Sequence, residues 1–175
     1  MSRLFRTALI VIVIGLIINE SRISSDAEQL AERLPRLELE QMSDAWNQLD
    51  DLARKSRLGI ATGGLEQLLV ERSTALAERV IANYRSPSPT VRENQWRTAR
   101  DVLAHAAGHA RSNERLRALL RYTEGHLHRI NGEARKARNE DAEAQRELTD
   151  AVAAFREAAE LRPSWPDPFL GLMRT

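Results

Sequence analysis

The sequence predicts an all-α fold in which helices pair as antiparallel hairpins. Charged residues make up 29% of the 175 residues and aromatic residues only 5%, and Ala, Leu, Arg and Glu dominate, a profile that favours helices over sheets. Apolar residues recur at steps of three and four along most of the chain, which is typical of amphipathic helices. The length is enough for one or two small domains with a hydrophobic core.

Charge and cysteine content exclude several kinds of site. The formal net charge of +1 predicts no general affinity for polyanions, and no nucleic-acid-binding motif is recognisable. The chain has no cysteine, which excludes disulfides and thiolate metal sites but leaves the compartment open.

The first 25 residues contain an uninterrupted apolar run, Ala8–Ile18, which Arg3 and Arg6 precede. A membrane-spanning helix needs about 20 residues. The run can therefore cross a membrane only if Leu4, Phe5 and Thr7 extend it and the Arg6 side chain reaches toward the lipid headgroups. We expect residues 4–18 to form a single-pass membrane anchor, with the bulk of the chain on the extracytoplasmic side because basic residues start the chain. A cleaved signal sequence and a buried core helix are the alternatives.

Residues 26–58 carry the pattern of an amphipathic helical stalk with one kink. Pro35 interrupts the first apolar stripe, so a break is expected near Leu34. A second stripe then follows at steps of four, three and four: Met42, Trp46, Leu49 and Ala53. This stripe fits either a short coiled coil or packing within the chain, and the second interpretation is favoured.

The next helix is predicted over residues 65–84, between two breaks. Gly59–Gly64 contains the only glycine cluster, and Leu65 and Glu66 follow it where a phosphate-binding loop needs lysine and then serine or threonine. We therefore expect a plain connecting loop. Two prolines in Ser86–Thr90 predict a linker after the helix.

The strongest pattern lies in residues 119–172, where small residues, one ring and one proline follow a fixed order. Small residues allow two helices to approach closely, a ring fills the space between them, and proline ends a helix. The residues in this order are Gly125, Gly132, Ala151, Phe155, Ala158 and Pro163. The pattern resembles the tetratricopeptide repeat (TPR), and the resemblance implies a helical hairpin in which Phe155 packs against the helix around Gly125.

The hairpin is expected to be longer than the standard repeat. Gly132 lies nineteen residues before Ala151, whereas the standard spacing is about five, and the excess corresponds to roughly two extra turns on each helix. A degenerate copy of the second helix precedes the hairpin, with Ala99, Leu103 and Ala106 in the same register.

The resemblance covers residues 91–175. With the 65–84 helix as a partner it implies a short TPR-like solenoid over residues 65–175. Residues 165–173 resemble the opening of a further repeat, so we expect the sequence to be a piece of a longer chain.

No group of side chains predicts catalysis, a metal site or a cofactor. His105 and His109 are four residues apart on a predicted helix and could face one metal ion, but a third ligand is not evident, and we interpret them as helix-surface residues. Adjacent carboxylates such as Asp50 and Asp51 point in different directions on a helix, so they do not form an acid/base pair.

The resemblance also implies a peptide-binding groove, because the first helix of each TPR hairpin lines the concave face. The residues in that position are Leu119, Tyr122, His126, Arg129 and Ile130. Amphipathic and basic side chains suit an extended peptide with acidic character.

These observations favour a membrane-anchored scaffold or adaptor that binds a protein or peptide partner and catalyses no reaction. One alternative is the extracytoplasmic helical-repeat arm of a bacterial receptor-like serine/threonine kinase or another signalling protein, although no kinase motif is present. The other is a metal-dependent enzyme that uses His105 and His109.

Overall fold

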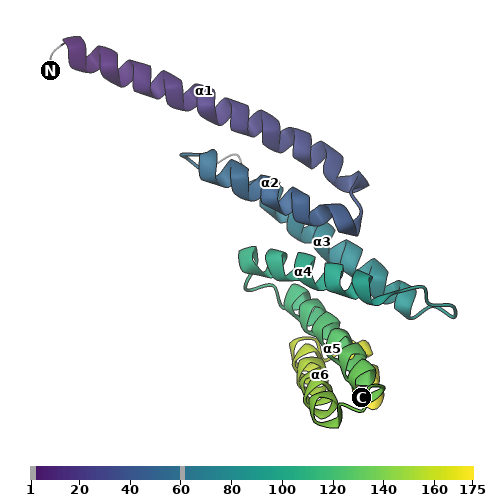
Figure 1. The fold of residues 1–175 in the computed structure, drawn as a ribbon. Coiled ribbons are helices and arrows are strands. Elements are labelled where there is room, and N and C mark those ends of the chain that lie inside the picture. The colour runs from purple at the N-terminus through teal and green to yellow at the C-terminus, as the bar shows by residue number, and fades with distance from the viewer. Residues whose placement is uncertain (1–2, 60–61) are drawn as a thin grey trace. The chain divides into compact units, whose positions relative to one another are not determined.

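The computed structural model describes residues 3–59 and 62–175, and the prediction of an all-α fold is confirmed: in this part of the chain every regular element is a helix. Two compact units divide the chain, Met1–Arg72 and Ser73–Thr175. The α-helices are α1 (Arg3–Arg33), α2 (Met42–Lys55), α3 (Gly63–Tyr84), α4 (Glu93–His109), α5 (Glu114–Lys136), α6 (Asp141–Leu161) and α7 (Asp167–Met173), and two 3-10 helices cover Leu34–Arg36 and Leu39–Gln41. Figure 1 shows these helices in chain order.

In the first unit, the predicted break near Leu34 is present. Helix α1 ends at Arg33, and Pro35 lies in the first turn of the 3-10 helix that follows, where a missing backbone donor costs nothing. Helix α2 contacts α1 and buries one face, consisting of Met42, Ala45, Trp46, Leu49 and Leu52. The predicted stripe is therefore buried within the chain, except that Leu52 replaces Ala53, which is exposed.

The expected membrane anchor over residues 4–18 is wrong, because no helix in the described residues is both long and apolar enough to cross a membrane. The run Ala8–Ile18 rises only about 16 Å, roughly half of the hydrocarbon thickness. Just beyond it, Glu20 accepts hydrogen bonds from the Ser56 hydroxyl at 2.7 Å and the Arg57 backbone N–H at 2.6 Å. These two donors lower the pKa of Glu20, so a charged carboxylate ends the run. The single-pass topology deduced from the anchor loses its basis.

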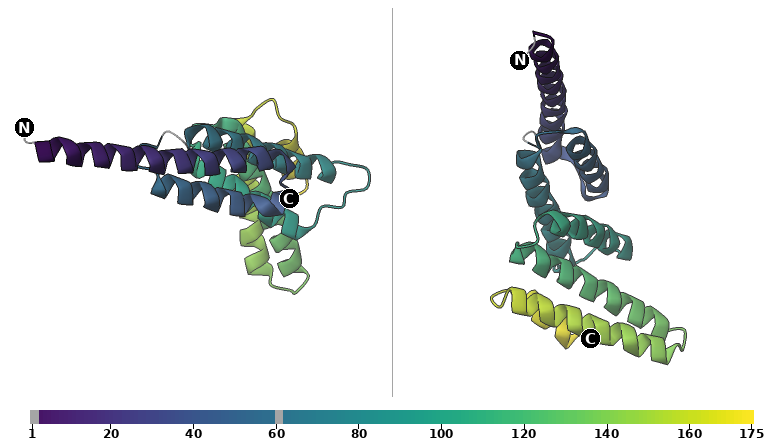
Figure 2. Two further views of the ribbon diagram at one scale, coloured as in Figure 1. Left: turned by 90° about the horizontal axis from the view of Figure 1, so that it is seen from above. Right: turned by 90° about the vertical axis from the view of Figure 1, so that its left-hand side faces the viewer.

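In the second unit, α5 and α6 lie side by side in opposite directions (Figures 1 and 2). Their lengths of 23 and 21 residues agree with the predicted elongation. The turn between them places Asn139 at φ 60°, a left-handed conformation that asparagine tolerates better than most residues. Helix α4 packs on α5, and α7 contacts both α5 and α6.

The side chain of Phe155 on α6 packs against both α5 and α7. Its side chain is 0% exposed. A Cβ added to Gly125 on α5 would lie 2.7 Å from Phe155 Cδ1, and one added to Gly171 on α7 would lie 2.8 Å from Phe155 Cε1. Both glycines are therefore needed to admit the ring. Ala151 and Ala158, one turn to either side of Phe155 on α6, are fully buried.

The other residues of the predicted packing pattern also lie at helix contacts. Gly132 admits the side chain of Leu148, which a Cβ would approach to 2.9 Å. Helix α6 ends two residues before Pro163. On α4, the three residues that repeat the spacing of Ala151, Phe155 and Ala158 are buried: Ala99, Leu103 and Ala106.

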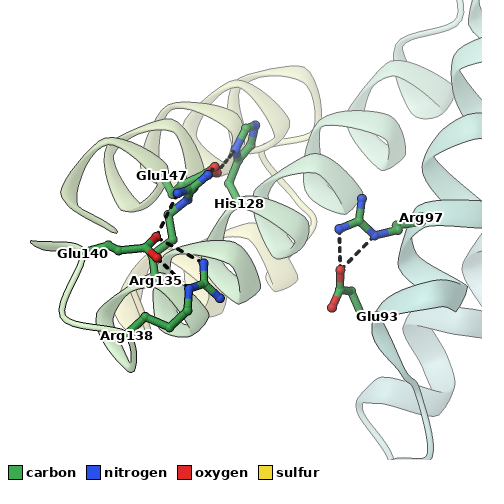
Figure 3. Close-up of polar contacts among 7 residues, drawn as sticks. All are labelled: Glu93, Arg97, His128, Arg135, Arg138, Glu140 and Glu147. Carbon is green, nitrogen blue, oxygen red and sulfur yellow. Dashed lines mark hydrogen bonds and ion pairs between the residues drawn. The ribbon is translucent and has the colours of Figure 1, made fainter. Parts of the chain in front are cut away.

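Ion pairs join the two helices at the tip of the α5–α6 hairpin (Figure 3). Glu140 accepts from Arg135 at 3.0 Å and from Arg138 at 2.8 Å, and His128 Nδ1 lies 2.8 Å from a carboxylate oxygen of Glu147. These side chains are partly exposed to solvent, which screens their charges, so the pairs contribute little to stability. The stability of the hairpin therefore depends mainly on its apolar middle.

Replacing Phe155 with alanine should lower the free energy of unfolding by about 3–5 kcal/mol, because a fully buried ring is lost and a cavity remains. Urea denaturation of the full chain, followed by far-UV circular dichroism, measures this value. A loss below about 1 kcal/mol would show that the ring does not fill the space between the helices.

Gly125→Ala should destabilise the chain by about 1–3 kcal/mol, because the new methyl group would overlap the Phe155 ring. Gly108→Ala on α4 is the matched control, since its Cβ would meet nothing within 4 Å. This variant should be as stable as the unaltered chain or more stable, by up to about 1 kcal/mol, because alanine favours a helix over glycine. Equal stabilities of the two variants would contradict the close approach of α5 to Phe155.

Candidate functional site

A pocket of about 500 Å³ opens beside the carboxyl end of α3, between α5 and α7 in the second unit. Its size lies within the range of about 300–1,000 Å³ that is typical of small-ligand sites. The lining side chains that matter for the chemistry are Tyr84, Arg85, Tyr122, His126, Asp167 and Arg174.

His126 forms the inner wall of this pocket and lies among aromatic rings. Its imidazole stacks on Trp96 with a centroid distance of 4.4 Å, and the edges of Tyr84 and Tyr122 approach it at 4.7 and 4.6 Å. The side chain is 1% exposed, and neither ring nitrogen has a hydrogen-bond partner in the described part of the chain. Burial, followed by the charge of Arg129, lowers the pKa of His126 to about 3, so the ring is neutral at physiological pH.

Two guanidinium groups donate to the hydroxyl of Tyr84, which lines the pocket. Arg174 donates to the hydroxyl oxygen at 3.3 Å and Arg129 at 3.4 Å. Arg129 also pairs with Glu133 on the same helix. Arg174 has no carboxylate partner among the residues that the structure describes.

Asp167 is the one carboxylate among the residues that line the pocket. It is 2% exposed and accepts from Arg85 at 3.3 Å through Oδ1. Its Oδ2 atom has no hydrogen-bond partner within the described residues. The pocket thus combines a basic rim with one buried acceptor, which suits a ligand that carries both negative charge and a donor.

The structure brings three of the five predicted groove residues together. Tyr122 and His126 line the pocket, and Arg129 donates to the hydroxyl of Tyr84, another lining residue. Leu119 is buried and lies beside a separate hollow near Trp165. Ile130 is half-buried and does not line the pocket.

No sequence pattern indicated a binding role for four of the pocket residues: Tyr84, Arg85, Asp167 and Arg174. Arg85 and Asp167 are 82 residues apart, and no spacing rule connects such distant positions. The two prolines that flank Asp167 were a local signal for a helix start, but they did not indicate a binding role.

The two histidines that could face one metal ion, His105 and His109, do not line this pocket. His105 and His109 stack on each other along α4, with ring centroids 5.6 Å apart and planes inclined by only 5°. This arrangement follows directly from their four-residue spacing.

Comparison with known proteins gave no relative. A scan against protein-family models matched none, and searches of curated proteins and of solved structures returned no significant match.

Acidification should destabilise the chain through His126. The pKa is about 3 in the folded chain and about 6.5 when unfolded, so the unfolded state binds more protons between these values. Stability is therefore full above about pH 6.5 and falls as the pH drops toward 3, at up to about 1.4 kcal/mol per unit. Urea denaturation between pH 7.5 and 5 measures the slope.

His126→Leu should flatten the dependence of stability on pH, because leucine does not titrate. Equal slopes for His126→Leu and the unaltered chain would exclude His126 as the source.

Proposed function

We propose that the chain is a TPR-like interaction scaffold that catalyses no reaction and binds an acidic peptide segment of a partner protein at the α3–α5–α7 pocket. The single observation that carries this proposal is that two arginines, Arg85 and Arg174, line one pocket. A third, Arg129, donates to the hydroxyl of Tyr84 in the pocket wall. Only one carboxylate lines the same pocket.

The arginine rim suits carboxylate ligands for geometric reasons. A guanidinium is planar and presents paired donors that match the two oxygens of a carboxylate. Arg85 is 53% exposed, so its side chain can adjust to a ligand. Tyr84 and Tyr122 provide apolar walls next to these charges, and such a mixture is typical of peptide-binding surfaces.

The helical framework supports the same proposal. Helices α5, α6 and α7 pack through small residues and one central ring, and the TPR resemblance implies such packing between the two helices of a hairpin. Hairpins of this kind stack into rigid arrays that present side chains at fixed positions. A rigid array recognises an extended peptide at a low cost in conformational entropy.

A catalytic role has less support at this pocket. General acid–base chemistry needs a titratable group within reach of a reacting atom and with a pKa near the working pH. His126 lines the pocket but fails the second condition, because burial lowers its pKa to about 3.

The direct test measures binding of synthetic peptides to the full chain. We expect a pool of about ten-residue peptides rich in Asp and Glu to bind better than a matched pool of Asn and Gln peptides, with free amino ends and amidated carboxyl ends in both. Arg174→Ala should weaken binding of the acidic pool about tenfold, which corresponds to one charge-assisted hydrogen bond. Fluorescence anisotropy measures the affinities.

Arg97→Ala is the matched control, because Arg97 is an exposed arginine on α4 that pairs with Glu93 (Figure 3). Its loss should leave binding unchanged. Equal binding of the acidic and amide pools, or an equal loss in Arg174→Ala and Arg97→Ala, would contradict the proposal.

A further inference from the structure

Asp167 lines the pocket, and one of its carboxylate oxygens is a buried acceptor without a partner in the described part of the chain. Its side chain is 2% exposed, and Oδ2 has no donor among the described residues. Buried carboxylate oxygens are normally hydrogen-bonded, since an unpaired one is costly. A ligand that brings a donor to this oxygen therefore gains more than it would at an exposed carboxylate.

The walls near Asp167 are suited to a cation. Tyr84 and Tyr122 both line the pocket, and aromatic faces attract ammonium groups. Burial, followed by the charge of Asp167, raises the pKa of Tyr122, so its phenol is neutral and does not repel a second anion. The donor that fits best is thus a compact ammonium group.

Arg85 can make way for such a group. It holds Asp167 through one contact of 3.3 Å to Oδ1 and is 53% exposed. When an ammonium pairs with Asp167, the Arg85 guanidinium becomes available for a carboxylate of the ligand. The exchange keeps each charge paired and adds a donor for Oδ2.

The spacing along α7 defines where the negative charge of the ligand must lie. Asp167 and Arg174 are seven residues apart, which is about 10 Å along a helix axis. An extended peptide covers this distance in roughly three residues. An ammonium at Asp167 therefore places the second or third side chain of the peptide near Arg174.

We propose that the pocket recognises the free amino terminus of a peptide, with the ammonium on Asp167 and an acidic side chain at the second or third position on Arg174. This inference rests on the proposed function and specifies how the acidic peptide is oriented. A lysine side chain offers the same ammonium chemistry, so the experiment separates the two sources.

The test compares three forms of one acidic peptide pool on the unaltered full chain, so no variant has to fold. The first has a free amino end, the second an acetylated end, and the third an acetylated end with lysine as its first residue. All have Asp or Glu at positions two and three. We expect acetylation to weaken binding at least tenfold and lysine not to restore it.

A second arm uses Asp167→Asn, which keeps the shape of the side chain and removes its charge. The free and acetylated pools should bind this variant equally. Its thermal unfolding midpoint is compared with that of the unaltered chain to check that the variant folds. The affinities of the free and acetylated pools are compared with each other on the same protein, not between the two proteins.

The outcomes separate this inference from the proposed function. If acetylated peptides bind the unaltered chain as well as free ones, amino-terminal recognition is wrong but acidic-peptide binding stands. If the lysine pool binds as well as the free pool, the assignment to a chain terminus is wrong. If no pool binds, both proposals are wrong.

Discussion

The contact of the Phe155 ring with Gly125 and Gly171 is the constraint on which the second unit depends. A ring of this size fits only because neither neighbouring helix carries a Cβ there. Large apolar side chains that fill such a space contribute several kcal/mol each. Most of the surrounding polar pairs are exposed and contribute little, so one close contact fixes how α5, α6 and α7 approach one another.

The position of α7 links this contact to the candidate site. Gly171 contacts the ring on one side of α7, and Asp167 and Arg174 on the same short helix segment line the pocket. His126, whose ring centroid lies 5.2 Å from that of Phe155, forms the inner wall. The packing that stabilises the hairpin therefore also sets the distance between the acidic and basic groups of the pocket.

Local chemistry in the sequence was sufficient to predict the helices and their central packing. Pro35 indicated the end of α1, and the order of Gly125 and Phe155 indicated a close helix pair. The membrane anchor was wrong because the apolar run is short and Glu20, held charged by Ser56 and Arg57, follows it. The pocket was only partly predictable, since Arg85 and Asp167 meet across 82 residues. Leu119 and His126 are buried because α5 is covered by more than one neighbouring helix.

The most direct measurement of the central contact is nuclear magnetic resonance of the full chain with labelled glycine and phenylalanine. The structure predicts strong nuclear Overhauser effects from the Phe155 ring protons to the Hα protons of both Gly125 and Gly171, with ring-current shifts of those protons. Effects to only one glycine, or to neither, would contradict a single ring that holds three helices together.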